Sequence, residues 1–372
     1  MPKVNIAASA LLFVPIFVTY IPGRGFITSA NPFNLFELPS VPLSVILLPF
    51  LALYFVKFRK IAIVLAVVLA ATIYSVIIWQ ATGLYRQFFY VLSLALAMTA
   101  FYLGLAIFKD NEGLSTVSIL KNILMSILLV KLLFDLATGS LMTDFFIISK
   151  LSIYNFYDYF PVVYFLLFAL SFELFFRTSQ YKHLLGVGIG LLVFLTWSRL
   201  FQLSVIIVFI YYLGLFYRIN KHTQINLTLV CVLILMFYFA LQYDPRNVGD
   251  RSLHERFTHW HEFLGSFRAI DLILPFLNSY RQELNNGTLH NEFLDVYSYF
   301  GPFTLIGFMA FYRGRSVRDR SGGRIVAVVS IVFILGSLVQ NNITQFYSCI
   351  LYFFIIGALN GHQNRVVVRK IG

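Results

Sequence analysis

Residues 61–79 read IAIVLAVVLAATIYSVIIW, a run without a single charged side chain. About 20 such residues are what an α-helix needs to cross the hydrocarbon core of a bilayer. Across the 372 residues, 59% are hydrophobic and 12% are charged, whereas a soluble domain carries about 25% charged residues. The apolar runs lack the two-residue alternation of a membrane barrel. The sequence therefore predicts an all-α polytopic membrane protein.

The apolar runs predict about twelve transmembrane helices, with ten or eleven possible, in a single integral membrane domain over residues 1–372. The first run, 4–21, follows a basic start like that of a signal peptide. No Ala-x-Ala-like cleavage site follows it, so we expect a retained helix. The other predicted spans lie near residues 43–57, 61–79, 87–108, 117–137, 160–176, 184–198, 200–217, 225–242, 291–312, 324–341 and 346–361.

The distribution of Lys and Arg predicts the orientation of the chain. With twelve spans, most of the 28 basic residues fall on one side, which the positive-inside rule assigns to the cytoplasm together with both termini. This accounts for most of the net charge of +12, so the basic composition does not indicate nucleic-acid binding. The basic clusters on that side lie at residues 57–60, 177–182, 218–221, 313–324 and 365–370.

One outward segment is long, at residues 243–290, and we expect it to be a periplasmic loop. It is basic on the side where positive charge is normally avoided, so it is either simply solvated or built to bind an anion. Its stretch from Arg256 to Phe263 has amphipathic spacing and could lie on the membrane with Trp260 among the headgroups. The loop carries Arg246, Arg251, Arg256, Arg268 and Arg281 together with His254, His259, His261 and His290.

Two further features lie at the predicted outer face. Arg199 stands between two apolar runs, where it is either a snorkelling anchor or an anion-binding group, because guanidinium forks suit phosphate. His290 stands where the long loop meets the next helix, with Glu292 and Asp295 in the first turn of that helix. The two cysteines, Cys231 and Cys349, lie far apart in apolar runs and are predicted to be packed thiols.

Three motifs resemble those of the O-antigen ligase and polymerase superfamily. His290-Asn291, nine residues, Gly301, two residues and Thr304 is similar to its His-Asn/Ser/Gln, x9, Gly-x-x-Gly/Thr/Tyr pattern. Trp197-Ser198-Arg199 resembles its Ser/Thr-Arg at the tip of a helical hairpin, and Arg256-x-x-x-Trp260 resembles its Arg-x-x-x-aromatic segment. The likeness covers roughly the last 180 residues, and the first half matches only as generic spans.

The resemblance implies a GT-C-like, metal-independent glycosyltransferase of the bacterial inner membrane, acting at the periplasmic face on glycans linked to undecaprenyl pyrophosphate. His290 would be the general base for the acceptor hydroxyl, and Arg199 and Arg256 would stabilise the leaving pyrophosphate. Arg281 is a further candidate for the anion site, and Asn291, Glu292 and Trp260 are candidate supporting residues. No metal or cofactor is implied; a chain-length regulator and a flippase are possible partners.

Two activities of the superfamily stay open, together with one reading outside it. The compact chain and short loop favour a polymerase that joins lipid-linked repeat units. The sequence Leu289-His290-Asn291-Glu292 is ligase-like and favours transfer of finished polymer to lipid A core. A lipid-linked oligosaccharide flippase would need ionisable groups near the bilayer midplane. The only candidates for that are Lys121, Lys131, Asp135 and Glu173.

Overall fold

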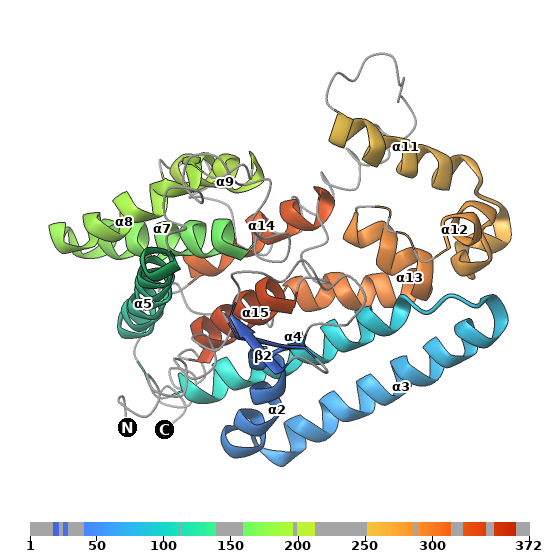
Figure 1. Ribbon diagram of the computed structural model, residues 1–372, viewed down its shortest axis with the longest axis horizontal. Coiled ribbons are helices and arrows are strands. Elements are labelled where there is room, and N and C mark those ends of the chain that lie inside the picture. Colours follow the sequence, from blue (N-terminus) through green and yellow to red (C-terminus); the bar gives the residue numbers. More distant parts are fainter. Residues whose placement is uncertain are drawn as a thin grey trace, which may run out of the picture.

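The computed structural model describes residues 18–21, 25–28, 41–109, 111, 113–138, 159–195, 199–212, 251–285, 287, 289, 291–313, 323–339 and 346–361. The helical prediction is confirmed in these ranges, where apolar helices occur at ten of the predicted spans (Figure 1). The span predicted at 225–242 lies outside the described residues. The helices are α2 (Leu43–Phe55), α3 (Phe58–Thr82), α4 (Gln87–Ile107), α5 (Gly113–Thr138), α7 (Tyr159–Thr178), α8 (Leu184–Gly190), α9 (Arg199–Tyr212), α13 (Glu292–Arg313), α14 (Gly323–Val339) and α15 (Phe346–Gly361).

The predicted span at 184–198 is not one regular helix. After the seven residues of α8, the chain tightens into the 3-10 helix η4 (Leu191–Leu195). A short 3-10 turn, η3 (Tyr181–His183), precedes α8. Such tight turns are common where an α-helix begins or ends. The segment therefore divides into short helical pieces packed against α7.

A small antiparallel sheet corrects the prediction for the first span. Strand β1 (Val18–Ile21) lies between β2 (Gly25–Thr28) and β3 (Val41–Pro42). The helix predicted at 4–21 is therefore wrong at its C-terminal end, and residues 4–17 lie outside the described part of the chain. The strand has a physical reason, since its sequence, VTYI, consists of β-branched and aromatic residues, and a Pro-Gly pair follows it.

Within the described ranges, two helices, α3 and α4, are long and apolar enough to cross a membrane. Helix α3 buries little of its surface, and Ile73 and Ile77 remain 54% and 58% exposed. A face this long and this apolar is unfavourable in water and marks contact with lipid or another apolar partner. Shorter apolar stretches occur at Gly113–Leu129, Tyr181–Phe194, Ile325–Ser337 and Cys349–Asn360.

The core forms where α15 packs along α4, with α5, α7 and α14 near them (Figure 1). The two backbones approach closely at a pair of glycines. A Cβ atom on Gly104 would lie 2.2 Å from the carbonyl oxygen of Phe354, and one on Gly357 would lie 2.1 Å from that of Phe101. Small residues allow two apolar helices to approach this closely.

Helix α13 is broken at Gly301, the glycine of the His-Asn-x9-Gly motif. Its φ of 81° and ψ of −176° fall in a region that is essentially restricted to glycine. A Cβ atom there would also lie 3.1 Å from the carbonyl oxygen of Ile273. Pro302 follows and lacks the N–H that a continuous helix would use. The motif glycine therefore has a structural reason in this chain.

Substitution of Gly301 by alanine is expected to destabilise the protein by about 1–3 kcal/mol, because it forces a Cβ atom into a strained backbone conformation. Thermal unfolding of the detergent-solubilised protein measures the loss. Gly188, in α8, is the matched control because nothing lies within 4 Å of its added Cβ atom. A Gly301→Ala protein that unfolds at the same temperature as Gly188→Ala would contradict the assigned strain.

Candidate functional site

The segment predicted as a long loop is folded from residue 251 onward. It contains α11 (Arg251–Gly265), the 3-10 helices η6 (Ala269–Leu272) and η7 (Pro275–Leu277), and α12 (Ser279–Glu283). Figure 1 shows α11 and α12 on the side of the molecule toward which α3 ends, and η7 contacts α3 directly. Residues 243–250 lie outside the described part. The segment predicted as a long loop therefore contains short helices over residues 251–285.

Trp260 anchors α11 to the start of α13. The amphipathic stretch is confirmed as a helix, but Trp260 does not lie among headgroups, since its ring is only 2% exposed. It packs with Phe263, Leu289 and Leu294 in a small apolar cluster. The indole Nε1–H donates a hydrogen bond of 2.7 Å to the carbonyl oxygen of Leu289. Trp260 therefore contacts the residue that precedes His290 in the chain.

The residues on either side of His290 are held by hydrogen bonds. The N–H of Leu289 donates to Oδ1 of Asp295 over 2.9 Å, so both backbone groups of Leu289 have partners. Asn291 caps α13, because its Oδ1 accepts the N–H groups of Phe293 and Leu294 at 3.0 and 3.1 Å. His290 itself lies outside the described residues. Its two chain neighbours are fixed at the N-terminus of α13.

Arg281 is fully buried and binds the segment that leads to His290. Its Nη2 donates hydrogen bonds of 2.6 Å to the carbonyl oxygens of Asn285 and Gly287. Its Nη1 lies 3.6 Å from Oδ1 of Asp295, and its guanidinium carbon lies 4.4 Å from the ring centre of Tyr299. Arg281 thus has a structural role that the sequence did not reveal, while its role in anion binding stays a prediction.

Four buried polar side chains, Tyr90, Arg281, Asp295 and Tyr299, form what we call the inner polar cluster. Each is at most 4% exposed, and the rings of Tyr90 and Tyr299 lie 5.7 Å apart. Within the described residues, Tyr299 Oη and Arg281 Nε have no hydrogen-bond partner. Buried polar atoms are usually satisfied, so the cluster has spare capacity to bind water or a polar group.

From the sequence, Arg281 and Asp295 of this cluster were singled out, and Tyr90 and Tyr299 were not. Asp295 follows Asn291 by one helical turn and precedes Tyr299 by another, so this spacing could have indicated a shared polar face. Tyr90 belongs to α4, in the half of the chain without motifs, and no local signal connects it to α13. Glu292, a predicted supporting residue, is buried in the first turn of α13 beside this face.

The two arginines of the motifs are on separate helices. Arg199 is the first residue of α9, and its side chain lies outside the described ones. Arg256 lies in α11 and is half-buried. The described contacts do not bring these two side chains together. A shared pyrophosphate site for Arg199 and Arg256 therefore stays a prediction.

Other candidate groups have local partners. The carboxylate of Glu173 accepts hydrogen bonds from Arg177 and from Tyr212 in α9.

Cys349 is buried, as predicted, and its thiol donates to the carbonyl oxygen of Ser93 over 3.6 Å. Cys231 lies outside the described residues. His259 Nδ1 lies 2.6 Å from Tyr280 Oη, and partial burial lowers the pKa of His259.

No family model matches the chain, and no curated protein is significantly similar to it. Within the described part of the chain, no three His, Cys, Asp or Glu side chains are grouped as metal ligands. A functional assignment consequently depends on the residues and their geometry.

Proposed function

We propose that the chain is an integral membrane glycosyltransferase of the O-antigen polymerase type. It takes a glycan from an undecaprenyl-pyrophosphate carrier and joins it to a sugar hydroxyl of a second lipid-linked repeat unit. The observation that carries the proposal is the support around His290. Trp260 and Asp295 bind the two backbone groups of Leu289, and Asn291 caps α13. Such support is what a general base needs, because catalysis depends on a held geometry.

The arrangement of α3 supports a membrane topology with the site outside. The basic residues Lys57, Arg59 and Lys60 lie at the start of this apolar helix. Phe276 of η7 packs against Tyr74, in the last third of the same helix. The basic turn and the folded 251–285 segment therefore lie toward opposite ends of α3. By the positive-inside rule, the basic end is cytoplasmic and the candidate site is periplasmic.

Reporter fusions after Asp250 and after Gly372 test this topology. We expect alkaline phosphatase to be active in the first fusion and inactive in the second, because that enzyme folds only outside the cytoplasm. A cytoplasmic reporter such as green fluorescent protein should give the reverse pattern at the same two positions. Phosphatase activity only after Gly372 would invert the topology and remove the catalytic site from the periplasm.

Arg199 and Arg256 are proposed to bind the donor pyrophosphate. Arg199 is the first residue of α9, where the helix dipole disfavours a positive side chain. Its charge therefore does not serve the stability of the helix, whereas an anion there would meet both the guanidinium and the positive end of the helix dipole. Arg256 would supply a second fork from α11, the helix that Trp260 attaches to the start of α13.

Substitution of Arg199 or Arg256 by lysine is expected to remove most polymer, since a point charge does not reproduce the bidentate fork. Gel analysis of the glycans of cells that express each variant at normal level measures the effect. Arg59→Lys is a matched control, because Arg59 is an exposed arginine at the start of α3, at the end opposite the candidate site. Full polymer in both motif variants would contradict the assignment.

Ligase activity is the second candidate, favoured by the Leu-His-Asn-Glu sequence that ends at Glu292. The glycan profile of cells that lack the gene separates the candidates. A single repeat unit on lipid A core indicates loss of a polymerase. Unsubstituted core with accumulated lipid-linked polymer indicates loss of a ligase. Repeat units retained on the cytoplasmic side would indicate a flippase and contradict both enzyme assignments.

A further inference from the structure

The chain between α11 and α12 makes a hairpin at residues 268–278, and the tip of this hairpin is apolar and uncovered. Ile270, Leu272 and Ile273 are 47%, 58% and 63% exposed. Ala269 is exposed as well, whereas Asp271 is fully buried, so the tip presents apolar side chains only. Three large apolar side chains side by side on an extramembrane segment would be costly in water.

Two independent contacts place the hairpin below the ends of its neighbouring helices. The carbonyl oxygen of Ile273 lies against Gly301 of α13, about 14 Å along that helix from its first residue at 1.5 Å per residue. The ring of Phe276 packs on Tyr74 with centres 6.4 Å apart, about 12 Å before the end of α3. These two distances from the helix ends agree. Each is a little under half of the thickness of a hydrocarbon core, which is about 30 Å.

The aromatic residues at the end of α3 mark a level above the hairpin. Trp79 and Tyr85 are 45% and 53% exposed near the turn between α3 and α4. Exposed Trp and Tyr are typical of the membrane–water interface. Tyr74, which contacts Phe276, lies more than one helical turn below Trp79. The contact therefore lies on the hydrocarbon side of that aromatic level.

Backbone carbonyl groups of the hairpin have the hydrogen bonds that a position at membrane depth requires. Non-helical backbone at membrane depth is tolerated only where its polar groups are satisfied. Tyr297 Oη donates to the carbonyl oxygens of Asp271 and Leu272, over 3.0 and 3.2 Å. The carbonyl oxygen of Ile270 accepts the N–H groups of Ile273 and Leu274 at 3.1 and 2.9 Å. The carbonyl groups of Ile270, Asp271 and Leu272 thus have partners.

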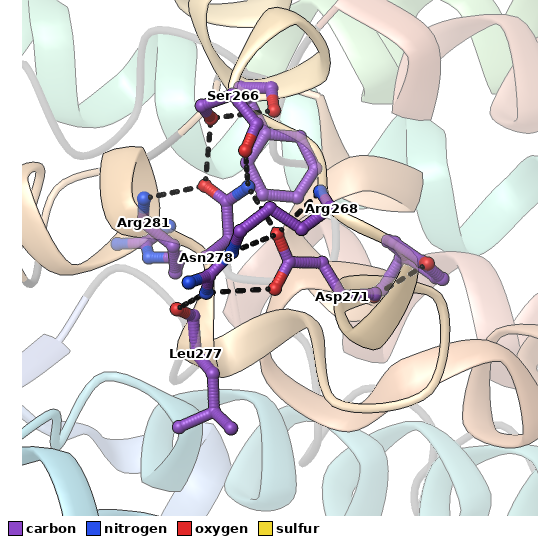
Figure 2. A network of polar contacts seen from close by, with 8 residues as sticks. Ser266, Arg268, Asp271, Leu277, Asn278 and Arg281 are labelled. Carbon is purple, nitrogen blue, oxygen red and sulfur yellow. Dashed lines mark hydrogen bonds and ion pairs between the residues drawn. The ribbon is translucent and has the colours of Figure 1, made fainter.

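A network of polar contacts closes the neck of the hairpin (Figure 2). Arg268 pairs with Asp271 over 3.2 Å and donates to the carbonyl oxygen of Leu277 over 2.8 Å. Asn278 donates to the same carboxylate over 3.2 Å and accepts the N–H of Arg281 over 3.1 Å. The buried acid is thereby neutralised. The Arg268 side chain stays 58% exposed, as a snorkelling arginine does.

We propose that residues 268–278 form a re-entrant hairpin whose tip, at Ile270, Leu272 and Ile273, is immersed in the acyl chains of the outer leaflet. Lipid is the occupant because the hairpin packs on α3, whose exposed apolar face continues toward the same chains. The inference rests on the membrane placement in the proposed function. It does not depend on the transferase chemistry.

Spin labels measure the environment of the tip in proteoliposomes. Cys231 and Cys349 are replaced by alanine, and a nitroxide is attached to a single cysteine at position 270, 272 or 273. Labels at Ile77, an exposed residue of α3, and at His261, an exposed residue of α11, are the references for lipid and water. We expect the tip labels to collide several-fold more often with oxygen than with a water-soluble nickel chelate, as at Ile77, and the His261 label to show the reverse.

Three outcomes would overturn the inference, and they are distinguishable. Tip labels that behave like His261 while Ile77 reports lipid would place the hairpin in water and leave the membrane topology intact. Tip labels shielded from both reagents would show a protein partner, such as a second copy of the chain, in place of lipid. A water-exposed Ile77 label would remove the membrane placement itself. Three separate tip positions guard against one label that disturbs the fold, and each labelled protein must unfold at the unlabelled temperature.

Discussion

Replacement of His290 by alanine is expected to reduce glycan transfer by about 10² to 10⁴-fold, because that is the usual cost of losing a positioned acid or base. Purified enzyme assayed with lipid-linked repeat units measures the rate, and gel analysis of cellular glycans should show no polymer. The variant should still insert and fold. The support at Leu289 and Asn291 comes from backbone groups and from other side chains, none of which the substitution removes.

His261→Ala is the matched control for this experiment. His261 belongs to α11, close to Trp260, but its side chain is exposed and matches no motif, so its variant should keep most activity. Activity should also persist in chelator, because arginines replace a metal in the proposed mechanism. An active His290→Ala enzyme would contradict the assignment and transfer the search for a base to Glu292 and Asp295. Loss of activity in chelator with recovery on adding a divalent ion would contradict the metal-independent chemistry.

Asp295→Ala is expected to destabilise the folded protein by about 3–5 kcal/mol, because it leaves a buried charge without its partner. Asp295 and Arg281 are both 0% exposed, and the same substitution removes the acceptor for the Leu289 N–H. Chemical or thermal unfolding in detergent measures the loss. The rate of glycan transfer should fall together with the stability, since Leu289 adjoins the proposed base, His290.

A double variant separates charge from hydrogen bonding at this pair. Asp295→Asn keeps an oxygen for the Leu289 N–H, and Arg281→Gln removes the buried charge while keeping an amide donor for the carbonyl oxygens of Asn285 and Gly287. The combined variant should therefore recover much of the stability that Asp295→Ala loses, because neutral replacement of a buried ion pair is often nearly free of cost. A stable Asp295→Ala protein, or a double variant no better than Asp295→Ala, would contradict the structural role of the pair.

The helices could be predicted from the sequence because apolar runs near 20 residues have few alternatives in a bilayer. The start of α4 at Gln87 and the extent of α15, Phe346–Gly361, were obtained closely from this pattern. The small sheet was missed, since Val18–Ile21 continues an apolar run whose length favours a helix. The fold of residues 266–285, after α11, was missed for a different reason. Its order comes from side-chain hydrogen bonds such as Arg268 with Leu277, which no periodicity reveals.

For the site, local sequence identified the chemistry but not the contacts. His290, Asn291 and Gly301 stand out by their motif, and the structure gives Asn291 and Gly301 local reasons, a helix cap and a backbone break. Arg281 has no motif, and its burial depends on Asp295 and on Tyr299 in another element. Tyr90 is still farther away in the sequence. Its position beside Tyr299 depends on how α4 packs against α13, and such tertiary packing cannot be read from local sequence.

The contact of Gly104 with the backbone of α15 has a consequence for biogenesis. Helix α4 leaves the ribosome long before α15, and at about 5 to 20 residues per second the delay is on the order of ten seconds or more. During that time, in the proposed membrane topology, α4 lies in the bilayer without α15, and Ser93, whose carbonyl oxygen accepts the Cys349 thiol in the finished protein, faces lipid or the insertion machinery. Assembly of this protein is therefore completed only after translation nears its end, and truncation before Phe346 should leave an inserted but unassembled chain.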